Sequence, residues 1–173
     1  TPPCVPSAGP VILWRPACGP SRVAAQALQV THVCLLVYDY NKGYFQLFSN
    51  DREDIIEEDQ NLLDNKHPII AFFEKTGKPL NKYIVEKNTY HPDERDQLLP
   101  VFDTLRASLI VPMISKTKLI GMIALGQKKS GELFVHEDLE LLTTIANQSV
   151  TALENAKSYE EVEKLNRDLE KKV

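Results

Sequence analysis

Histidine and cysteine could perform nucleophilic, redox or metal chemistry in this chain, yet neither type falls into a recognisable motif. No two histidines stand four residues apart, the spacing of a metal-binding pair on a helix. The three cysteines are an odd number without repeated short spacing, so they predict neither a disulfide framework nor a zinc site. We therefore expect no catalytic residue and no metal site. The residues concerned are His32, His67, His91 and His136, with Cys4, Cys18 and Cys34.

One looser arrangement stays open as an alternative. Asp93, Arg95 and Asp96 follow His91 and could contribute to a non-haem iron site, although no spacing rule supports it. His67 and His136 stand next to the expected starts of two helices, where surface positions explain them most simply. Whether any of these groups meet depends on the elements that position them.

The best-defined elements lie in residues 108–157. Two apolar runs, at 109–111 and 119–125, are joined by a short polar turn and predict a β-hairpin whose first strand ends at Pro112. Gly121 and Gly126 lie in and just after the second run, where a missing side chain permits a bulge or the close approach of another element. A long amphipathic helix follows, with acidic residues at its start that complement the helix dipole. Its apolar positions include Leu139, Leu142, Ile145 and Ala146.

The first half of the chain predicts a second hairpin and several helices. Residues 33–38 form a continuous apolar strand, and a turn returns the chain through residues 44–48. A short helix is expected at residues 21–28, and an amphipathic helix at 65–75 that ends at Gly77. The remaining expectations are an edge strand containing Tyr83, Ile84 and Val85, and a short helix containing Leu98, Leu99, Val101 and Phe102.

The overall composition restricts the classes of function. With 173 residues, of which 43% are hydrophobic, the chain can bury one sizeable core, and a second full domain is not expected. A net charge of −4 leaves no broad basic surface, so nucleic-acid binding is not expected. No apolar run approaches the roughly 18 residues that cross a bilayer, and no signal peptide opens the chain. We expect a soluble, cytoplasmic domain.

The order of these features resembles the C-terminal half of a GAF domain, the small-molecule sensory module of phosphodiesterases, phytochromes, histidine kinases and bacterial transcription activators. The matching segment runs VPM…KLIGMIALGQKKSGELFVHEDLELLTTIANQSVTALENA. The resemblance implies an α+β fold, with a GAF/PAS-like central antiparallel sheet of five to six strands flanked by helices and a long C-terminal signalling helix. Terminal helices would cover one face, and a helix-and-lid layer would enclose a pocket on the other. The candidate pocket and lid residues are Phe48, Phe73, Tyr90, His91 and Phe102.

The cyclic-nucleotide-binding members of this family carry an Asn-Lys…Phe-x-x-x-Asp-Glu signature, which the chain matches in part. The corresponding residues are Gln127, Lys128, Phe134, Asp138 and Leu139, so Gln replaces Asn and Leu replaces Glu. In that family the Lys and Asp form a salt bridge. We therefore expect Lys128 and Asp138 to tie the hairpin exit to the start of the long helix. The two departures weaken the case for a cyclic nucleotide, which stays an open ligand.

Two other activities of the family fit this chain less well. Covalent bilin attachment would use a cysteine beside a His or Tyr of the lid, but no cysteine follows Cys34, although Tyr90 and His91 lie in that region. Free methionine sulfoxide reductases need several cysteines around the pocket. Cys4 and Cys18 lie instead in a proline-rich segment. Neither a bilin nor this redox activity is expected.

The two ends of the chain differ from the GAF-like sensor domain at residues 21–157. Residues 1–20 hold six of the eleven prolines and predict an irregular segment. Residues 158–173 continue the long helix, and their seam steps by three and four as in a dimeric coiled coil, although a solvent-exposed helical tail is the alternative. The seam contains an Asn, which favours a parallel pair in one register. Its residues are Tyr159, Val162, Asn166, Leu169 and Val173.

We expect a regulatory sensory domain of a signal-transduction protein. It would bind a small molecule and relay its state through the dimeric C-terminal helix to an output domain absent from this chain, without being an enzyme itself. The first alternative is a ligand-free dimerisation or spacer module, and the second is an enzyme similar to free methionine sulfoxide reductase. Convergent polar groups behind the lid would favour a ligand, whereas inward Phe and Leu side chains that close the pocket would favour the spacer.

Overall fold

A six-stranded antiparallel sheet forms the centre of the computed structural model, which describes residues 20–50, 63–87 and 92–172. The strand order is β3-β2-β1-β6-β5-β4, so β1 and β6 are the central strands. The strands are β1 Val33–Asp39, β2 Tyr44–Asn50, β3 Leu63–Asp64, β4 Leu80–Asn81, β5 Leu109–Ser115 and β6 Lys118–Leu125. The helices are α1 Pro20–Leu28, α2 Pro68–Thr76, α3 Lys82–Glu86, α4 Pro92–Leu105 and α5 His136–Lys171.

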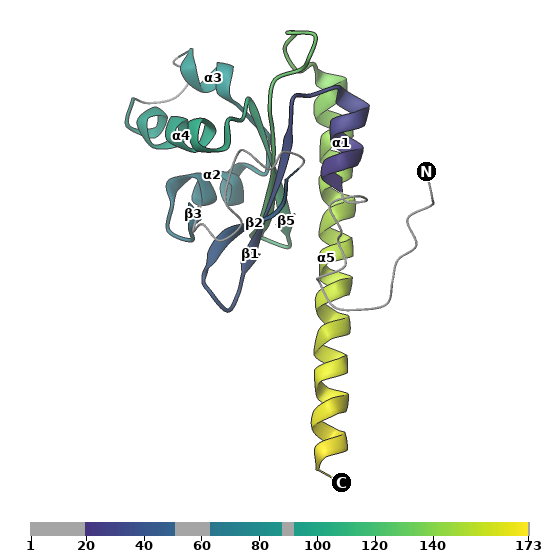
Figure 1. Cartoon of the computed structure of the whole chain (residues 1–173). Helices are drawn as coiled ribbons and strands as arrows, with labels where there is room; N and C mark the ends of the chain where they lie inside the picture. Colours follow the sequence, from purple (N-terminus) through teal and green to yellow (C-terminus); the bar gives the residue numbers. More distant parts are fainter. Residues whose placement is uncertain (1–19, 51–62, 88–91, 173) are drawn as a thin grey trace.

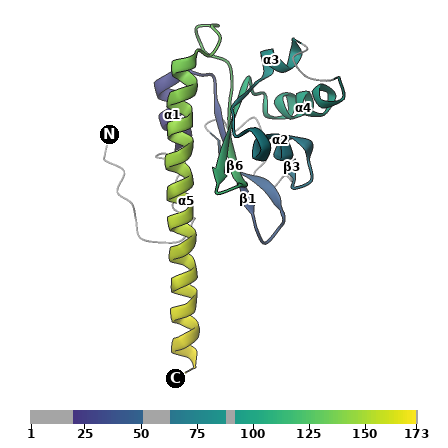
Figure 2. The same ribbon diagram turned by 180° about the vertical axis from the view of Figure 1, so that it is seen from behind.

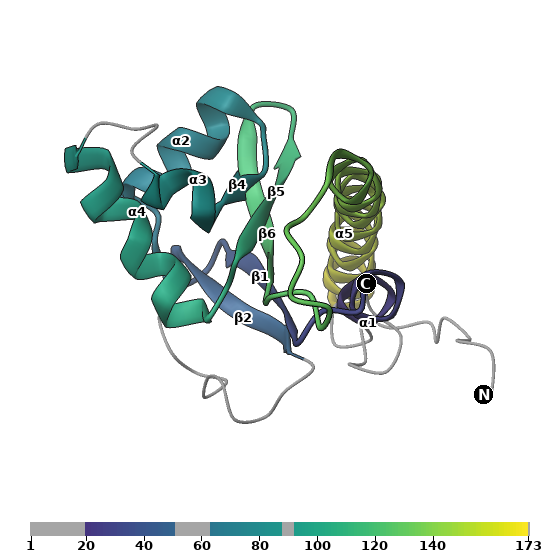
Figure 3. The same ribbon diagram turned by 90° about the horizontal axis from the view of Figure 1, so that it is seen from above.

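The helices form a layer on each face of this sheet. Helices α1 and α5 pack on one face, and α2, α3 and α4 pack on the other (Figures 1 and 2). The view from above shows α4 and α5 on opposite sides of the strands (Figure 3). This α+β arrangement, with its long C-terminal helix, confirms the expected fold.

Alternation along the central strands produces a hydrophobic core on each face. In β1, Cys34 and Leu36 belong to the cluster beneath α2 and α4, whereas Val33 and Leu35 belong to the cluster beneath α1 and α5. Successive strand residues point to opposite faces, so a strand covered on both sides must be apolar throughout. All four residues are fully buried. The continuous apolar runs of the sequence therefore correspond to strands with helices on both faces.

Two glycines permit close backbone contacts beside β1. A Cβ atom on Gly121 would lie 2.6 Å from the carbonyl oxygen of Leu36, across the β1–β6 pair. A Cβ on Gly126 would lie 2.2 Å from Thr31 Oγ1 and 2.5 Å from His32 Nδ1. These are the close approaches expected from the sequence, at two positions where no side chain fits.

The edge strand was wrongly predicted. Tyr83, Ile84 and Val85 lie in α3, and the edge strand β4 comprises the two residues before it. Asn81 caps the helix, because its side-chain oxygen accepts a hydrogen bond from the amide of Tyr83 at 2.9 Å. Only Val85 of these three side chains is buried, which fits one helical face rather than strand alternation.

The predicted end of strand β5 was also wrong. Pro112 does not terminate β5, which continues to Ser115. The neighbouring strand β4 pairs with β5 only at Leu109 and Ile110, so no described strand lies on the outer side of Pro112. A proline is tolerated in a strand where its missing N–H faces no partner.

Candidate functional site

A cavity of about 120 Å³ lies on the face of the sheet that α2 and α4 cover. Its walls come from β1, from β3, from the start of α2 and from the second half of α4. Five lining residues are apolar, and only a histidine and a threonine supply polar side chains. The lining residues are Leu36, Leu63, His67, Pro100, Val101, Thr104 and Leu105. This is the face on which the resemblance to GAF domains places a ligand pocket.

His67 is the first of the two polar residues in the cavity wall, and its hydrogen bonding defines its protonation state. It is the N-cap of α2, and its Nδ1 accepts a hydrogen bond from the amide of Ile69 at 3.2 Å. Burial lowers the pKa of His67, and the charge of Asp64 opposes this shift only in part. The ring is therefore neutral at pH 7, with its proton on Nε2, because an accepting Nδ1 carries none. The Nε2–H group is left as a hydrogen-bond donor.

Thr104 supplies the second polar group of the cavity. Its hydroxyl donates a hydrogen bond to the carbonyl oxygen of Pro100 at 2.9 Å, within α4. Pro100 has no amide hydrogen, so its presence interrupts the hydrogen-bond pattern of the helix at this point. With its proton engaged, the Thr104 oxygen can still accept a hydrogen bond. The cavity thus combines an apolar wall with one donor and one acceptor.

The expected pocket residues lie partly elsewhere. Phe73 of α2 and Phe102 of α4 are fully buried in the hydrophobic cluster on the cavity side, but neither is among the described lining residues. Phe48 lies in β2, although its side chain is outside the described part of the chain. Tyr90 and His91 fall outside the described residues, so the iron arrangement around His91 stays untested, although its other members, Asp93, Arg95 and Asp96, lie in α4. Sequence reasoning missed His67 as a cavity residue, although its position before Pro68 is a signal for a helix start.

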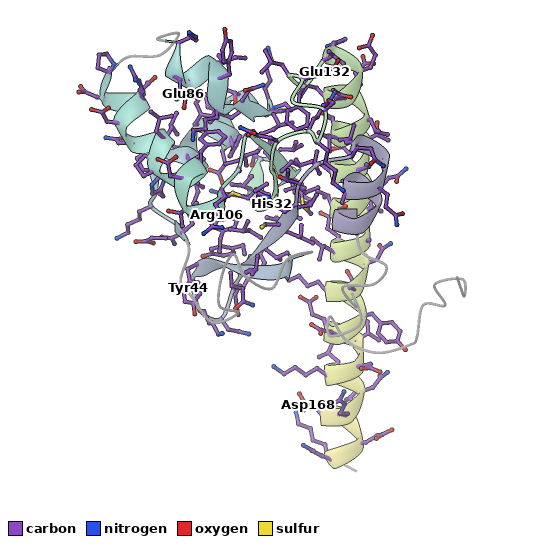
Figure 4. The ribbon with its side chains drawn as sticks, turned by 45° about the horizontal axis from the view of Figure 1, so that its top comes forward. His32, Tyr44, Glu86, Arg106, Glu132 and Asp168 are labelled. Carbon is purple, nitrogen blue, oxygen red and sulfur yellow. The ribbon has the colours of Figure 1, made fainter. Side chains whose placement is uncertain are left out.

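His32 is a buried polar residue with a structural position. Its Nε2 lies 3.2 Å from the carbonyl oxygen of Leu105, and its Nδ1 lies 3.1 Å from the hydroxyl oxygen of Thr31. The residue is labelled in Figure 4, and its side chain is only 4% exposed. It links the start of β1 to the end of α4, next to the cavity wall, and has no open side for a ligand.

Lys128 and Asp138 form an ion pair that ties the exit of β6 to the first turn of α5. The side chains are 13% and 14% exposed. Asp138 also accepts a hydrogen bond from the amide of Val135 at 2.8 Å, and Lys128 Nζ lies 5.7 Å from the ring centre of Phe134. Burial alone would raise the pKa of Asp138, but the Lys128 hydrogen bond, the Val135 amide and the Lys128 charge together lower it. This ion pair fixes the N-terminal end of α5, which packs on the face of the sheet opposite to the cavity.

The C-terminal part of α5 projects beyond the sheet and presents an apolar stripe to solvent. Asp168, labelled in Figure 4, lies on this projecting part. Of the expected seam, Tyr159, Val162 and Leu169 are more than half exposed, and Leu165 extends the same stripe at 62% exposure. Leu165 was missed by the sequence analysis. Asn166 is exposed and lies within the stripe by its helical position, and Val173 lies outside the described residues.

Other chemical groups are limited in the part of the chain that the structure describes. Cys34 is buried in β1, whereas Cys4 and Cys18 lie outside the described residues. Among the described side chains, no group of three His, Cys, Asp or Glu residues could hold a metal ion. Within the same ranges, no helix has the length and hydrophobicity that a bilayer span requires.

The fold agrees with the comparison to known proteins. Residues 21–155 match the GAF domain family, which is most of the chain. The chain belongs to this family. As a GAF domain, it is a sensory regulatory module of the kind present in signalling proteins.

Individual relatives support this assignment at different levels. Diguanylate cyclase A of Treponema denticola is 27% identical over 108 residues, which cover 62% of this chain and 28% of the cyclase. A methyl-accepting chemotaxis protein fragment, residues 122 to 287, has a TM-score of 0.60 at 16% identity, covering 79% of this chain and 85% of the fragment. The GAF domain of an Acinetobacter phosphoenolpyruvate-protein phosphotransferase has a TM-score of 0.55 at 13% identity, with 80% of each chain covered. At these identities the two structures show a shared GAF fold.

Proposed function

We propose that this GAF domain is the small-molecule sensor of a signal-transduction protein and relays its state through the dimeric C-terminal helix to an output domain. The observation that carries this proposal is the arrangement of the cavity and α5. A cavity with a polar pair lies on one face of the sheet, and a helix that projects beyond the domain packs on the other. A ligand that favours one arrangement of the sheet would shift the population of helix positions. No covalent chemistry by this domain is required.

The cavity favours a ligand that is small, uncharged and mostly apolar. Its volume of about 120 Å³ is below the roughly 300–1,000 Å³ of pockets for drug-sized molecules. It is closer to the engineered apolar cavity of about 150 Å³ that holds benzene. No Lys or Arg is among its described lining residues, so a phosphate group would lack a charged partner there. A cyclic nucleotide would require a larger, opened pocket.

Dimerisation is the second part of the proposal. Four apolar side chains of α5 are each more than half exposed on the stripe Tyr159, Val162, Leu165 and Leu169. Apolar positions that recur every three and four residues bury their faces when two helices pair. The partner chemistry proposed here is therefore a second copy of the same helix. A ligand-free dimerisation module remains the alternative function, because the stripe supports it equally.

Native mass spectrometry separates the two functions. The purified domain is measured before and after denaturation, and again during titration with cyclic AMP and cyclic GMP. A dimer that carries a copurifying mass of about the size of a six-membered ring compound supports the sensor with a small apolar ligand. A saturable shift with either nucleotide would contradict the proposed ligand class while retaining the sensor. A dimer without any bound mass, in which nucleotides cause no shift, would favour the dimerisation module.

A further inference from the structure

Two hairpin tips contact α5 at the point where this helix leaves the sheet. Tyr40, in the turn between β1 and β2, lies beneath Lys157, with the Nζ atom 3.8 Å from the centre of the ring. Ser115, at the end of β5, donates a hydrogen bond to the carboxylate of Glu154. Both contacts lie within four residues after Leu153, the last residue of α5 that is buried against the domain. Figure 1 shows that the β1–β2 hairpin extends in the same direction as the projecting end of α5.

The Tyr40 contact continues through packed rings to the cavity side of the sheet. The ring of Tyr38 lies 5.0 Å from that of Tyr40, nearly perpendicular to it, and 5.1 Å from that of Phe45. Tyr38 and Phe45 both belong to the hydrophobic cluster beneath α2 and α4. Leu36 lies two residues before Tyr38, on the same face of β1, and it lines the cavity. The hydrophobic cluster thus connects Leu36 of the cavity wall with Tyr38, and ring contacts continue from Tyr38 through Tyr40 to α5.

We propose that the β1–β2 hairpin is the coupling element of this domain, which transmits the filling of the cavity to α5 through Tyr38, Tyr40 and Lys157. This inference rests on the proposed sensory function. A packed core transmits strain, because its side chains cannot move without displacing their neighbours. A molecule that displaces Leu36 therefore shifts the Tyr38 ring, and this ring moves the one beneath Lys157.

The β5–β6 hairpin provides the second point at which the domain contacts α5. Among the described lining residues of the cavity, none comes from β5 or β6. In the proposed coupling, the contact between Ser115 and Glu154 is therefore displaced less directly than the contact between Tyr40 and Lys157. The hydrogen bond from the amide of Leu119 to Glu74 of α2 holds the β5–β6 hairpin from the helix side. Because Glu154 and Lys157 are neighbours on the surface of one helix, movement of one hairpin tip relative to the other tilts the helix at its exit.

Xenon is a suitable probe, because it enters small apolar cavities without requiring a specific hydrogen bond. The full chain, labelled with ¹⁵N, is placed under increasing xenon pressure, and the amide chemical shifts are followed by NMR. We expect saturable shifts at Leu36 and Val101 of the cavity wall. We also expect shifts with the same pressure dependence in α5 at Lys157 and the turn after it.

Matched variants test the path. Tyr40→Leu removes the ring that Lys157 contacts, so the xenon-dependent shifts in α5 are lost while those of the cavity wall are retained. Lys157→Gln has the same effect, and Lys157→Arg restores the helix shifts, because a guanidinium also stacks on a ring. Tyr44→Leu is the control, since this tyrosine lies in the same hairpin with a different lysine, Lys42, 6.0 Å from its ring centre. It leaves both sets of shifts unchanged.

The outcomes distinguish the coupling from the sensory function beneath it. Shifts at the cavity wall with none in wild-type α5 would overturn the coupling and leave the cavity intact. Equal loss of the helix shifts in Tyr40→Leu and Tyr44→Leu would overturn the path through Tyr40. The absence of any saturable shift at the cavity wall would instead contradict the cavity on which the sensory function rests, and the coupling with it.

Discussion

At the scale of single residues, His67 has two structural roles. It caps α2 through its Nδ1 atom, and it contributes the only aromatic side chain among the described residues that line the cavity. The cap fixes which nitrogen carries the proton, so the backbone of α2 determines the polarity that the cavity presents. The helix start and the candidate ligand site are therefore linked through one imidazole ring.

The lowered pKa of His67 makes stability depend on pH. Below the unfolded value of about 6.5, the unfolded chain binds a proton that the folded chain does not, so stability falls as the pH decreases. His67→Asn keeps a preferred cap but cannot titrate, so we expect a shallower decline than in the wild type. Urea unfolding between about pH 7.5 and pH 5.5 measures both slopes. If the stability of the wild type and of His67→Asn declined equally with falling pH, this result would contradict the lowered pKa of His67 in the folded protein. His67→Ala should cost about 1 kcal/mol at the higher pH.

Asp138 shows the opposite dependence on pH. Its folded pKa is lowered, so its contribution is present above the unfolded value of about 3.9 and is lost as the pH falls through the folded value. Asp138→Asn should reduce stability by about 1–2 kcal/mol at pH 7, because the charge-assisted hydrogen bonds are lost. The stabilities of the two proteins should converge as the pH falls through the folded pKa of Asp138. Asp168→Asn, on the exposed end of α5, is the control and should change stability by less than about 0.5 kcal/mol.

At the scale of elements, α5 consists of two parts that differ in what they pack against. Residues up to Leu153 bury one face against β5 and α1, whereas the residues after it carry an apolar stripe with no described partner. The first part is therefore stabilised by the domain. The second part, only about two heptads long, is marginal as an isolated helix. A partner helix would supply the missing contacts.

Leu165→Glu tests this stripe. A carboxylate cannot be buried in a helix pair without a partner charge, so the variant should dissociate more readily than the wild type. Sedimentation equilibrium measures the dimer constant, and circular dichroism reports on the sheet, which should stay unchanged. Lys164→Glu is a matched control, because its position is exposed on the side of α5 opposite to the stripe. An unaltered dimer constant for Leu165→Glu would exclude the stripe as the interface.

Much of the fold could be predicted because its strands and helices follow long runs of apolar residues or apolar residues at helical spacing. The two hairpins, the first helix and α5 follow directly from such patterns. The error at Tyr83 arose because three β-favouring residues were counted, whereas the cap at Asn81 decided the local structure. The resemblance to GAF domains placed a pocket on the cavity face of the sheet, but the residues that line it could not be predicted, since Leu63, His67 and Thr104 meet only through tertiary packing. Local pattern carries no information about that volume.

At the scale of the whole molecule, β1 and β6 separate two hydrophobic cores that share one sheet. Their residues alternate between the core beneath α2 and α4 and the core beneath α1 and α5. Opening these two strands would therefore disrupt both cores at once. We therefore expect the domain to unfold cooperatively, with the sheet as its most stable part.

Native-state hydrogen exchange tests this expectation. Amides of Leu35 and Ile123, in the middle of the paired central strands, should exchange only by global unfolding. Amides after Lys157 should exchange much faster when the protein is diluted, because dilution removes the partner helix. Equal protection of both groups in the monomer would contradict the division of α5 at its exit from the sheet.

The projection of α5 also has a mechanical consequence. At about 1.5 Å per residue, the helix carries Lys171 about 27 Å beyond Leu153, out of reach of any side chain of the sheet. In the coupling that we propose, the helix acts as a lever arm whose fulcrum lies between the two hairpin tips. A tilt of only about 5° at that fulcrum displaces the far end by about 2 Å. A sub-ångström adjustment beside the cavity could thus become a movement large enough to repack an interface at the end of the arm.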